Sequence, residues 1–315
     1  MYNEAVKQRF IRENAGSEKS QRNLVTLFNS IEKYEQEWNA DCCTKTAEEL
    51  QQMLNDVVGI RSNSQTVTLS LLRSYARWCV QNRVPGACDG LLEASVDNSA
   101  KLRLQMVQGP LQFQQYLNTV FAPEEDETVD LVYRCYLWCA FIGLEEESVL
   151  ELRTGDVDLN AMKLSHDEKL YDLPREAVPA FRRLTELDAF NYSNKNYGTI
   201  RRARNEGDML LRGYKGETKI RTLRAAVTDA GAMAVKDGKT QRRLTYDKAR
   251  LSGLFFRFYE RECNGDEPGF DRIASDWVSS RQPADTDPAK YRIMRNKKER
   301  ELKKDYNSWK SAFLL

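Results

Sequence analysis

Few residues of this chain are suited to catalysis by proton transfer or by a bound metal. His166 is the only histidine among the 315 residues. A Ser/His/Asp triad needs a histidine on a framework, and a histidine-rich metal site needs several. His166 lies in the polar stretch SHDEK, so the sequence predicts a solvated turn residue, with a catalytic base as the alternative.

The cysteines give no sign of a metal or disulfide site either. There are seven, an odd number, and no pair has C-x-x-C spacing. This pattern argues against a disulfide framework and against a zinc cage. Cys135 and Cys139 are four residues apart in an apolar segment, which indicates core packing. We therefore expect a protein of reducing cytoplasm that needs no metal and no cofactor.

An acidic triplet, Glu145, Glu146 and Glu147, directly follows the core-like pair Gly143-Leu144. The preceding apolar run, residues 131–144, contains Arg134 and is shorter than the roughly 18 residues that span a bilayer. The N-terminus is charged, so neither a membrane segment nor an export signal is expected. The position of the triplet, at the end of a helix that looks buried, needs an explanation.

Charge is strongly segregated although the net charge is only +1. Residues 123–172 hold 14 acidic and 4 basic side chains, whereas residues 201–250 hold 14 basic and 6 acidic ones. Residues 290–304 add a second basic segment, with 8 basic and 2 acidic side chains. Such blocks are typical of a solvated face, and two basic segments in one folded chain also suit a polyanion such as nucleic acid.

Hydrophobic spacing predicts helices throughout residues 1–90. Leu24, Leu27, Phe28 and Ile31 recur at intervals of three and four, the pattern of an amphipathic helix. We expect a small helical domain there. Residues 91–108 are irregular and rich in small residues, so the sequence predicts a linker.

The second domain is predicted over residues 109–315, with helices and a small sheet. The runs AMKLS and KLYDLP alternate around a polar turn and predict a β-hairpin. The predicted fold class is mainly α with a small antiparallel β-sheet, in two domains. Helices are expected at residues 111–121, 128–143, 145–153, 175–187, 218–235 and 246–262.

The order of these elements, together with particular residues, resembles the tyrosine recombinase family, the phage integrases. In that family a helical core-binding domain precedes a catalytic domain, and a helix ending in Gly-Leu-Arg leads to a conserved strand-entry segment and a β-hairpin. The residues that match that segment in register are Gly143, Leu144, Val149, Leu150, Leu152, Arg153, Asp156, Val157, Asp158 and Leu159.

The family's later motifs match less well. Its box of the form T-x-H-x-L-R-H-S aligns with TYDKARLS, where Thr245, Arg250 and Ser252 agree. Asp247 stands at the first histidine of that box, and Leu251 at the second. Near the C-terminus, Trp277 is the counterpart of a His/Trp position. Tyr291 is either the counterpart of the nucleophilic tyrosine or an ordinary residue of the basic helix.

The resemblance implies a disabled active site. In the family, arginine, lysine and histidine donors hold the non-bridging phosphate oxygens, and loss of one donor commonly costs about 10² to 10³ in rate. Glu145 stands at the first arginine, where at about 4 Å and an effective dielectric near 20 it would repel a phosphate by about 4 kcal/mol. Ser148 stands at the neighbouring acidic position, and Lys169 is at best the hairpin lysine. We therefore expect no strand cleavage.

Arg250 survives, and two roles are open for it. It either clamps a DNA phosphate or pairs with Glu145 across the former pocket, which would turn an anion site into a structural ion pair.

Integrase-type proteins bind duplex DNA from both sides, so the resemblance implies double-stranded DNA as the partner. Lysine and arginine side chains supply the sequence-independent affinity by releasing phosphate counterions. The candidate contacts are Arg61, Ser64, Arg73, Arg77, Arg201, Arg202, Arg221, Arg224, Arg242, Arg243, Lys248 and Arg250.

The expected function is sequence-specific DNA binding on a disabled recombinase scaffold, as in integrase-like lysogeny repressors of temperate phages, in the bacterial cytoplasm at the nucleoid. One alternative is an active integrase that uses Tyr291 and Arg250 with Lys169. Another is an accessory subunit of a partner recombinase. The apolar C-terminal end is either a self-association element or a closing core helix, and a regulatory protein or peptide is a further possible partner.

Overall fold

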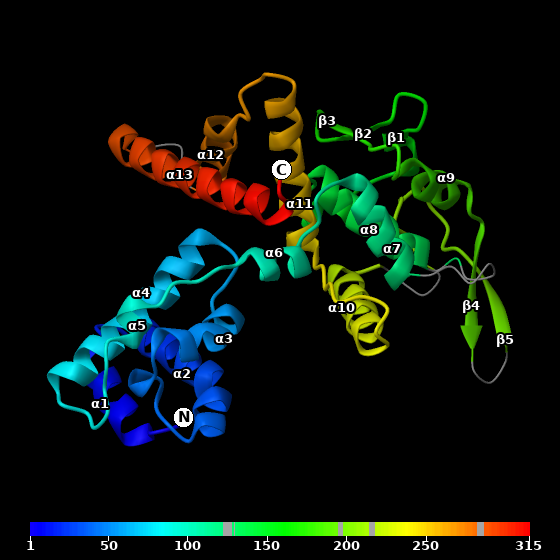
Figure 1. Cartoon of the computed structure of the whole chain (residues 1–315). Helices are drawn as coiled ribbons and strands as arrows, with labels where there is room; N and C mark the ends of the chain where they lie inside the picture. The colour runs from blue at the N-terminus through cyan, green and yellow to red at the C-terminus, as the bar shows by residue number, and fades with distance from the viewer. Residues whose placement is uncertain (122–127, 129, 195–197, 214–217, 282–286) are drawn as a thin grey trace. The chain divides into compact units, whose positions relative to one another are not determined.

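The computed structural model describes residues 1–121, 128, 130–194, 198–213, 218–281 and 287–315 (Figure 1). The chain is mainly α-helical with small antiparallel β-sheets, as the sequence predicts. It divides into two compact domains: the first comprises Met1–Leu102 and Phe270–Leu315, and the second comprises Arg103–Gly269. Within the described residues, no helix combines the length and apolar character that crossing a membrane requires.

This division differs from the predicted one at the C-terminal end. The sequence predicts one domain over residues 109–315, whereas the structure groups Phe270–Leu315 with the N-terminal helices. The predicted linker, residues 91–108, contains two short helices, and the boundary between the domains lies inside the second of them.

The first domain is built entirely from helices in its described residues. Its core is aromatic: the Phe10 ring lies edge-on to Tyr75 at 5.2 Å and to Trp78 at 5.6 Å, and Phe28 lies edge-on to Tyr75 at 5.0 Å. The helices are α1 (Glu4–Asn14), α2 (Glu18–Trp38), η1 (Cys42–Thr44), α3 (Ala47–Val57), α4 (Ser62–Gln81), α5 (Gly90–Glu93), α6 (Ser99–Gln105), α12 (Phe270–Ser279) and α13 (Pro288–Phe313).

The C-terminal helix α13 joins this domain through a long-range cap. The Asp305 carboxylate accepts a hydrogen bond of 2.6 Å from the backbone N–H of Ser62, at the start of α4. A carboxylate at a helix N-terminus satisfies a free donor and complements the helix dipole. On the same helix Tyr306 and Trp309 are buried, and their rings stack at 6.1 Å. Helix α13 packs against α12 (Figure 1). Of the two readings of the apolar C-terminal end, the structure contains the closing core helix.

The second domain combines helices with two small sheets. The predicted hairpin is present as β2 and β3, with Lys163 opposite Asp172 and His166 opposite Lys169. A second hairpin, β4–β5, was not predicted. The elements are α7 (Pro110–Val120), α8 (Asp130–Ile142), η2 (Glu147–Leu150), η3 (Thr154–Asp156), β1 (Val157–Asp158), β2 (Lys163–His166), β3 (Lys169–Asp172), α9 (Val178–Glu186), β4 (Ala189–Asn194), β5 (Gly198–Ala203), α10 (Ile220–Lys236) and α11 (Tyr246–Cys263).

Helix α8 is the centre of the second domain. It is buried on nearly all sides, and α9, α10 and α11 pack around it. Helix α11 approaches so closely at Gly253 that a Cβ there would lie 1.7 Å from the carbonyl oxygen of Phe141. Only glycine fits this contact, which fixes the middle of α11 beside the end of α8.

Candidate nucleic-acid interface

The turn after α8 explains how the acidic triplet reaches the surface. Gly143 has φ +107°, and its N–H donates to the Ala140 carbonyl at 2.9 Å, while the Leu144 N–H donates to the Cys139 carbonyl at 3.0 Å. This is the hydrogen-bond pattern that ends a helix with a left-handed glycine. Leu144 is fully buried, so the chain emerges from the core at Glu145. The predicted helix at residues 145–153 is reduced to the single turn η2.

Glu145 forms an ion pair with Arg250 of α11. The Arg250 Nη1 donates to the Glu145 Oε1, and the two side chains are 34% and 68% exposed. Of the two roles open to Arg250 in the sequence, the structure contains the pairing with Glu145. The guanidinium that the recombinase resemblance would aim at a phosphate is thereby bonded to a carboxylate of the same chain.

A second ion pair lies at the next residue. Arg224 of α10 donates from Nε to Glu146 Oε1 at 3.1 Å and from Nη2 to Glu146 Oε2, a bidentate geometry. The hydroxyl of Tyr136 donates to the same carboxylate. Burial alone would raise the pKa of Glu146, but the hydrogen bonds from Arg224 and Tyr136 outweigh it and hold that pKa below the ordinary value. The sequence does not predict this pair.

These two pairs make the surface between α10 and α11 one of mixed charge. Arg221 is exposed one turn before Arg224 on the same face of α10. Lys248 precedes Arg250 in the first turns of α11, and its N–H donates to the N-cap Thr245. Asp247 is exposed in the first turn of α11. The hydrogen bond to Glu146 is the main cause that raises the pKa of Arg224, and the negative charge of Asp247 acts in the same direction. The surface thus combines four cations with three carboxylates, and two ion pairs join Arg224 to Glu146 and Arg250 to Glu145.

Among the described residues, the remaining family counterparts form no ion pair with this cluster. Lys169 is exposed at the first position of β3. Tyr291 belongs to α13 and therefore to the first domain, where its hydroxyl donates to the Ser275 carbonyl at 3.3 Å and lies 3.1 Å from the Ser279 hydroxyl. Ser252 is buried and donates to the Lys248 carbonyl at 2.8 Å.

His166 departs from its expected setting. The sequence predicts a solvated turn residue, but the imidazole is only 10% exposed at the end of β2. Its Nε2 lies 3.3 Å from Asp167 and 3.6 Å from Glu151, both exposed carboxylates. Strand pairing turns the ring inward, a placement that the local SHDEK composition does not reveal.

In the first domain the candidate contacts fall into two sets on α4. Arg61 and Ser64 lie one turn apart and exposed at its start, and the positive charge of Arg61 is second to burial in lowering the pKa of Lys298 on α13. Arg73 and Arg77 lie one turn apart further along the helix. Arg73 is half-buried and donates to the Ala94 carbonyl at 2.9 Å, so part of its hydrogen-bonding capacity serves the fold.

The candidate DNA contacts on β5 and before α11 also differ in how exposed their side chains are. Arg201 and Arg202 are exposed neighbours on β5, so their side chains leave opposite faces of the hairpin. Arg242 is half-buried and donates to the Arg103 carbonyl at 2.8 Å, whereas Arg243 is exposed.

One basic residue inside the basic segment is structural. Arg204 is 7% exposed and donates to the carbonyls of Leu184, Leu187, Leu210 and Arg212. Burial lowers its pKa to about 10. It holds the end of β5 against the chain that follows α9, and charge counting alone cannot separate it from a DNA contact.

Comparison with known protein families gives a match for part of the first domain. Residues 1–81 match the family model described as MrpR, N-terminal core-binding domain. No curated protein matches the chain significantly. Among solved structures, the crystal structure of XerA recombinase is similar at 15% identity, covering 84% of this chain and 86% of that one with a TM-score of 0.35. Residues 1–81 are thus similar to a core-binding domain, the class that the sequence resemblance predicts for residues 1–90.

Proposed function

We propose that this protein binds double-stranded DNA on a recombinase-like scaffold without cutting it, and that it acts as a transcriptional repressor of a phage or another mobile element. A core-binding domain at the N-terminus supports a DNA partner. The exposed cations of α4 and α10, with the half-buried Lys248 and Arg250 of α11, provide the phosphate contacts, and their affinity comes from counterion release.

The single observation that carries the absence of cleavage is the ion pair between Glu145 and Arg250. Phosphodiester cleavage needs positive donors on the non-bridging oxygens as negative charge builds there. Here the surviving arginine of the aligned motif is bonded to a carboxylate that stands at the position of the missing one. The acidic Glu146 and Asp247 add further negative charge on the same surface.

Binding without cutting is compatible with this arrangement because the ion pair is at the surface. Exposed pairs contribute about 0 to 1 kcal/mol, so a DNA phosphate can replace Glu145 as the partner of Arg250 at small cost. The protein can then occupy an operator and exclude transcription. Repression then follows because the protein binds DNA but does not cleave it.

Genome-wide DNA capture with the full chain, followed by footprinting of the best site, tests this function. We expect one or a few sites that overlap promoters, protected over a continuous duplex segment, with affinity that falls steeply as salt rises. Weak binding with the same affinity for every sequence would contradict it and would favour an accessory subunit that acts through a partner recombinase.

A further inference from the structure

His166 and two carboxylates form a small cluster in the second domain. The imidazole lies at the end of β2, Asp167 is the first residue of the turn to β3, and Glu151 directly follows η2. The Nε2 atom of His166 is 3.3 Å from Asp167 Oδ2 and 3.6 Å from Glu151 Oε2. One nitrogen or oxygen atom from each of the three side chains lies within 4.8 Å of the other two. The cluster is thus compact enough to hold a single ion.

The imidazole is the feature that points to a ligand. The side chain of His166 is 10% exposed, and its Nε2 is buried without a hydrogen-bond partner among the residues that the structure describes. A buried ring nitrogen in this state is unfavourable, because it has lost the hydrogen bond that water would supply. A metal ion on Nε2 would remove this cost, since the lone pair of a neutral imidazole is a metal ligand.

The distances within the cluster match those of a tetrahedral metal site. Zn²⁺ binds imidazole nitrogen at about 2.0 to 2.1 Å and carboxylate oxygen at about 2.0 to 2.2 Å, so two such atoms at a tetrahedral angle are about 3.4 Å apart. The two distances from His166 Nε2, 3.3 and 3.6 Å, lie on either side of this value. An ion can therefore bind here without a rearrangement of the hairpin, and only the exposed carboxylates need to adjust.

We propose that His166, Asp167 and Glu151 bind a divalent transition-metal ion, with Zn²⁺ as the ion that this ligand set favours. Imidazole is a ligand of Zn²⁺ and its neighbours in the first transition series, whereas Mg²⁺ and Ca²⁺ prefer sets made only of oxygen. Three protein ligands leave the fourth position of a tetrahedral ion to water. The metal would join the β2–β3 turn to the segment after η2. This site goes beyond the proposed function and does not depend on it.

The sequence does not reveal this site. It predicts no metal, because it has a single histidine and no C-x-x-C spacing. Two carboxylates complete the ligand set instead, and Glu151 reaches His166 through the fold. Lys169 pairs with His166 in the strand register, so this exposed cation lies on the same face and opposes a metal ion. The two carboxylate charges outweigh its single positive charge.

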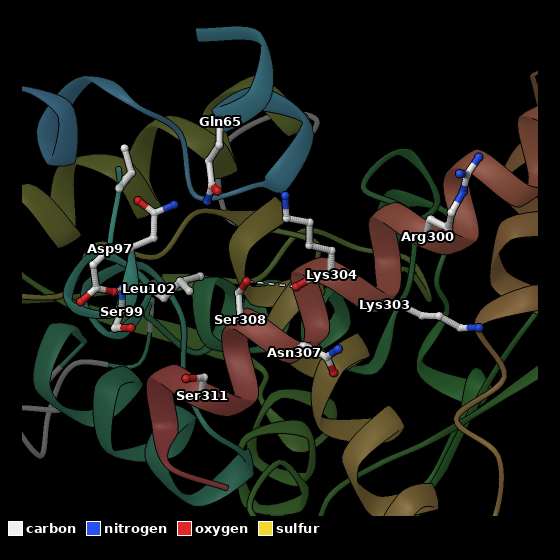
Figure 2. Close-up of a pocket in the computed structure, with 12 residues that line it drawn as sticks. Gln65, Asp97, Ser99, Leu102, Arg300, Lys303, Lys304, Asn307, Ser308 and Ser311 are labelled. Atoms are coloured by element: carbon white, nitrogen blue, oxygen red, sulfur yellow. Dashed lines mark hydrogen bonds between the residues drawn. The ribbon is translucent and has the colours of Figure 1, made fainter. Parts of the chain in front are cut away.

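The open groove of the first domain does not select a ligand in this way. It has a volume of about 600 Å³ and lies between the start of α4 and α13. Figure 2 shows Lys303 and Lys304 on its α13 wall, and both side chains are exposed. Exposed ammonium groups attract anions of every class. The cluster at His166, in contrast, combines a buried nitrogen with distances that fit one kind of ligand.

The single histidine makes a direct test possible, because its ring nitrogens can be observed without overlap. NMR spectra of the full chain without an affinity tag, labelled with ¹⁵N-histidine, are recorded during titration with ZnCl₂ and, separately, with MgCl₂. We expect the Nε2 resonance to shift and to saturate at one equivalent of Zn²⁺, and not to change with Mg²⁺ at the same concentration. Zn²⁺ binding that leaves both ring nitrogens unchanged, as binding to the exposed thiol of Cys263 would, overturns the inference. An equal response to Mg²⁺ also overturns it.

Isothermal titration calorimetry with three variants makes the result specific. E151Q and D167N each remove one ligand and should weaken Zn²⁺ binding by about tenfold or more, an effect that loss of an outer partner of a metal ligand already has. Asparagine tolerates the positive φ of Asp167, 47°, so D167N retains the turn. E168Q removes another exposed carboxylate from the same turn and should change the affinity by less than about threefold. Equal losses in all three variants, or unchanged affinity in E151Q and D167N, would overturn the inference.

Discussion

Two regions of this molecule bring cations and carboxylates together, and they differ in burial. In the first domain Lys7 pairs with Glu35, and both side chains are completely buried. In the second domain Glu145 pairs with Arg250, and Glu145 is 68% exposed. The chemistry of the two pairs is the same, but water reaches only the second.

The buried pair is held by a full set of partners. Glu35 also accepts from the Cys42 N–H at 3.0 Å, and the neighbouring Asp41 accepts from Cys43, Tyr75 and Asn3. Burial raises the pKa of Glu35 even though Lys7 opposes the shift. If a buried pair of this kind separates, an unpaired charge is left inside the protein. The exposed pair can separate in water, so Arg250 can bind a phosphate in place of Glu145. The difference indicates a structural role for the buried pair, whereas the exposed pair can separate, as the proposed DNA binding requires.

The largest expected effect comes from breaking the buried pair. K7M should lower the free energy of unfolding by about 3 to 5 kcal/mol, because Glu35 is left buried without its counter-charge. Chemical denaturation of the full chain measures this, and K19M, which removes an exposed lysine from α2, should change it by less than about 0.5 kcal/mol.

The same variant has a defined pH dependence. In K7M the pKa of the buried Glu35 lies above its unfolded value, so the destabilisation is present at neutral pH and is relieved as the pH falls through that raised pKa. A loss below about 1 kcal/mol at neutral pH would contradict the structural role of the pair.

The first domain was largely predictable because its signals are local. The spacing of Leu24, Leu27, Phe28 and Ile31 marks α2, and all four side chains are buried in it. The association of α13 with this domain was not predictable, because it depends on a hydrogen bond between Asp305 and Ser62, 243 residues apart. No periodicity records such a contact.

The next largest effect concerns the exposed pair of Glu145 and Arg250 and its proposed role in DNA binding. E145R replaces an acceptor with a donor beside Arg250, so DNA affinity should rise at low salt and the slope of log K against log salt should steepen by about 0.9. Electrophoretic mobility shifts over a salt series measure both. E145Q, which only removes the charge, should give a smaller rise, and unchanged affinity in both variants would place Glu145 outside the interface.

A single phosphate contact is tested by R221A. Arg221 is exposed on α10 one turn from Arg224. Its loss should weaken binding by about threefold to tenfold on every DNA sequence and reduce the salt slope by about 0.9. R182A, an equally exposed change on α9, serves as the control and should leave the slope unchanged.

The smallest effect concerns acid stability. The pKa of Glu146 is held below its ordinary value, so its contribution to stability is present above the unfolded pKa of a glutamate and is lost as the pH falls through the lower folded pKa. E146Q should therefore flatten the acid side of the stability profile below about pH 4.5 while leaving the second domain folded. An identical profile in E146Q and the unmodified chain would show that the ion pair with Arg224 adds nothing.

The candidate site was predictable only in part, for physical reasons. The alignment of Gly143 and Leu144 with the family motif drew attention to Glu145, and the structure contains the ion pair with Arg250. Glu146 lies beside it but pairs with Arg224, 78 residues away, through helix packing that sequence spacing does not encode. In the sequence, Arg204 does not differ from the other cations of the basic segment. Only the structure shows that its side chain is buried and does not belong to the surface.

The most direct test of the central claim uses a suicide DNA duplex that contains the identified binding site and traps any tyrosine-linked intermediate. The unmodified chain should shift the duplex in a native gel and leave no covalent adduct under denaturing conditions, because the carboxylate of Glu145 stands beside Arg250 where a scissile phosphate would need a second positive donor. A denaturation-resistant adduct that disappears in Y291F would contradict the account and would establish an active recombinase.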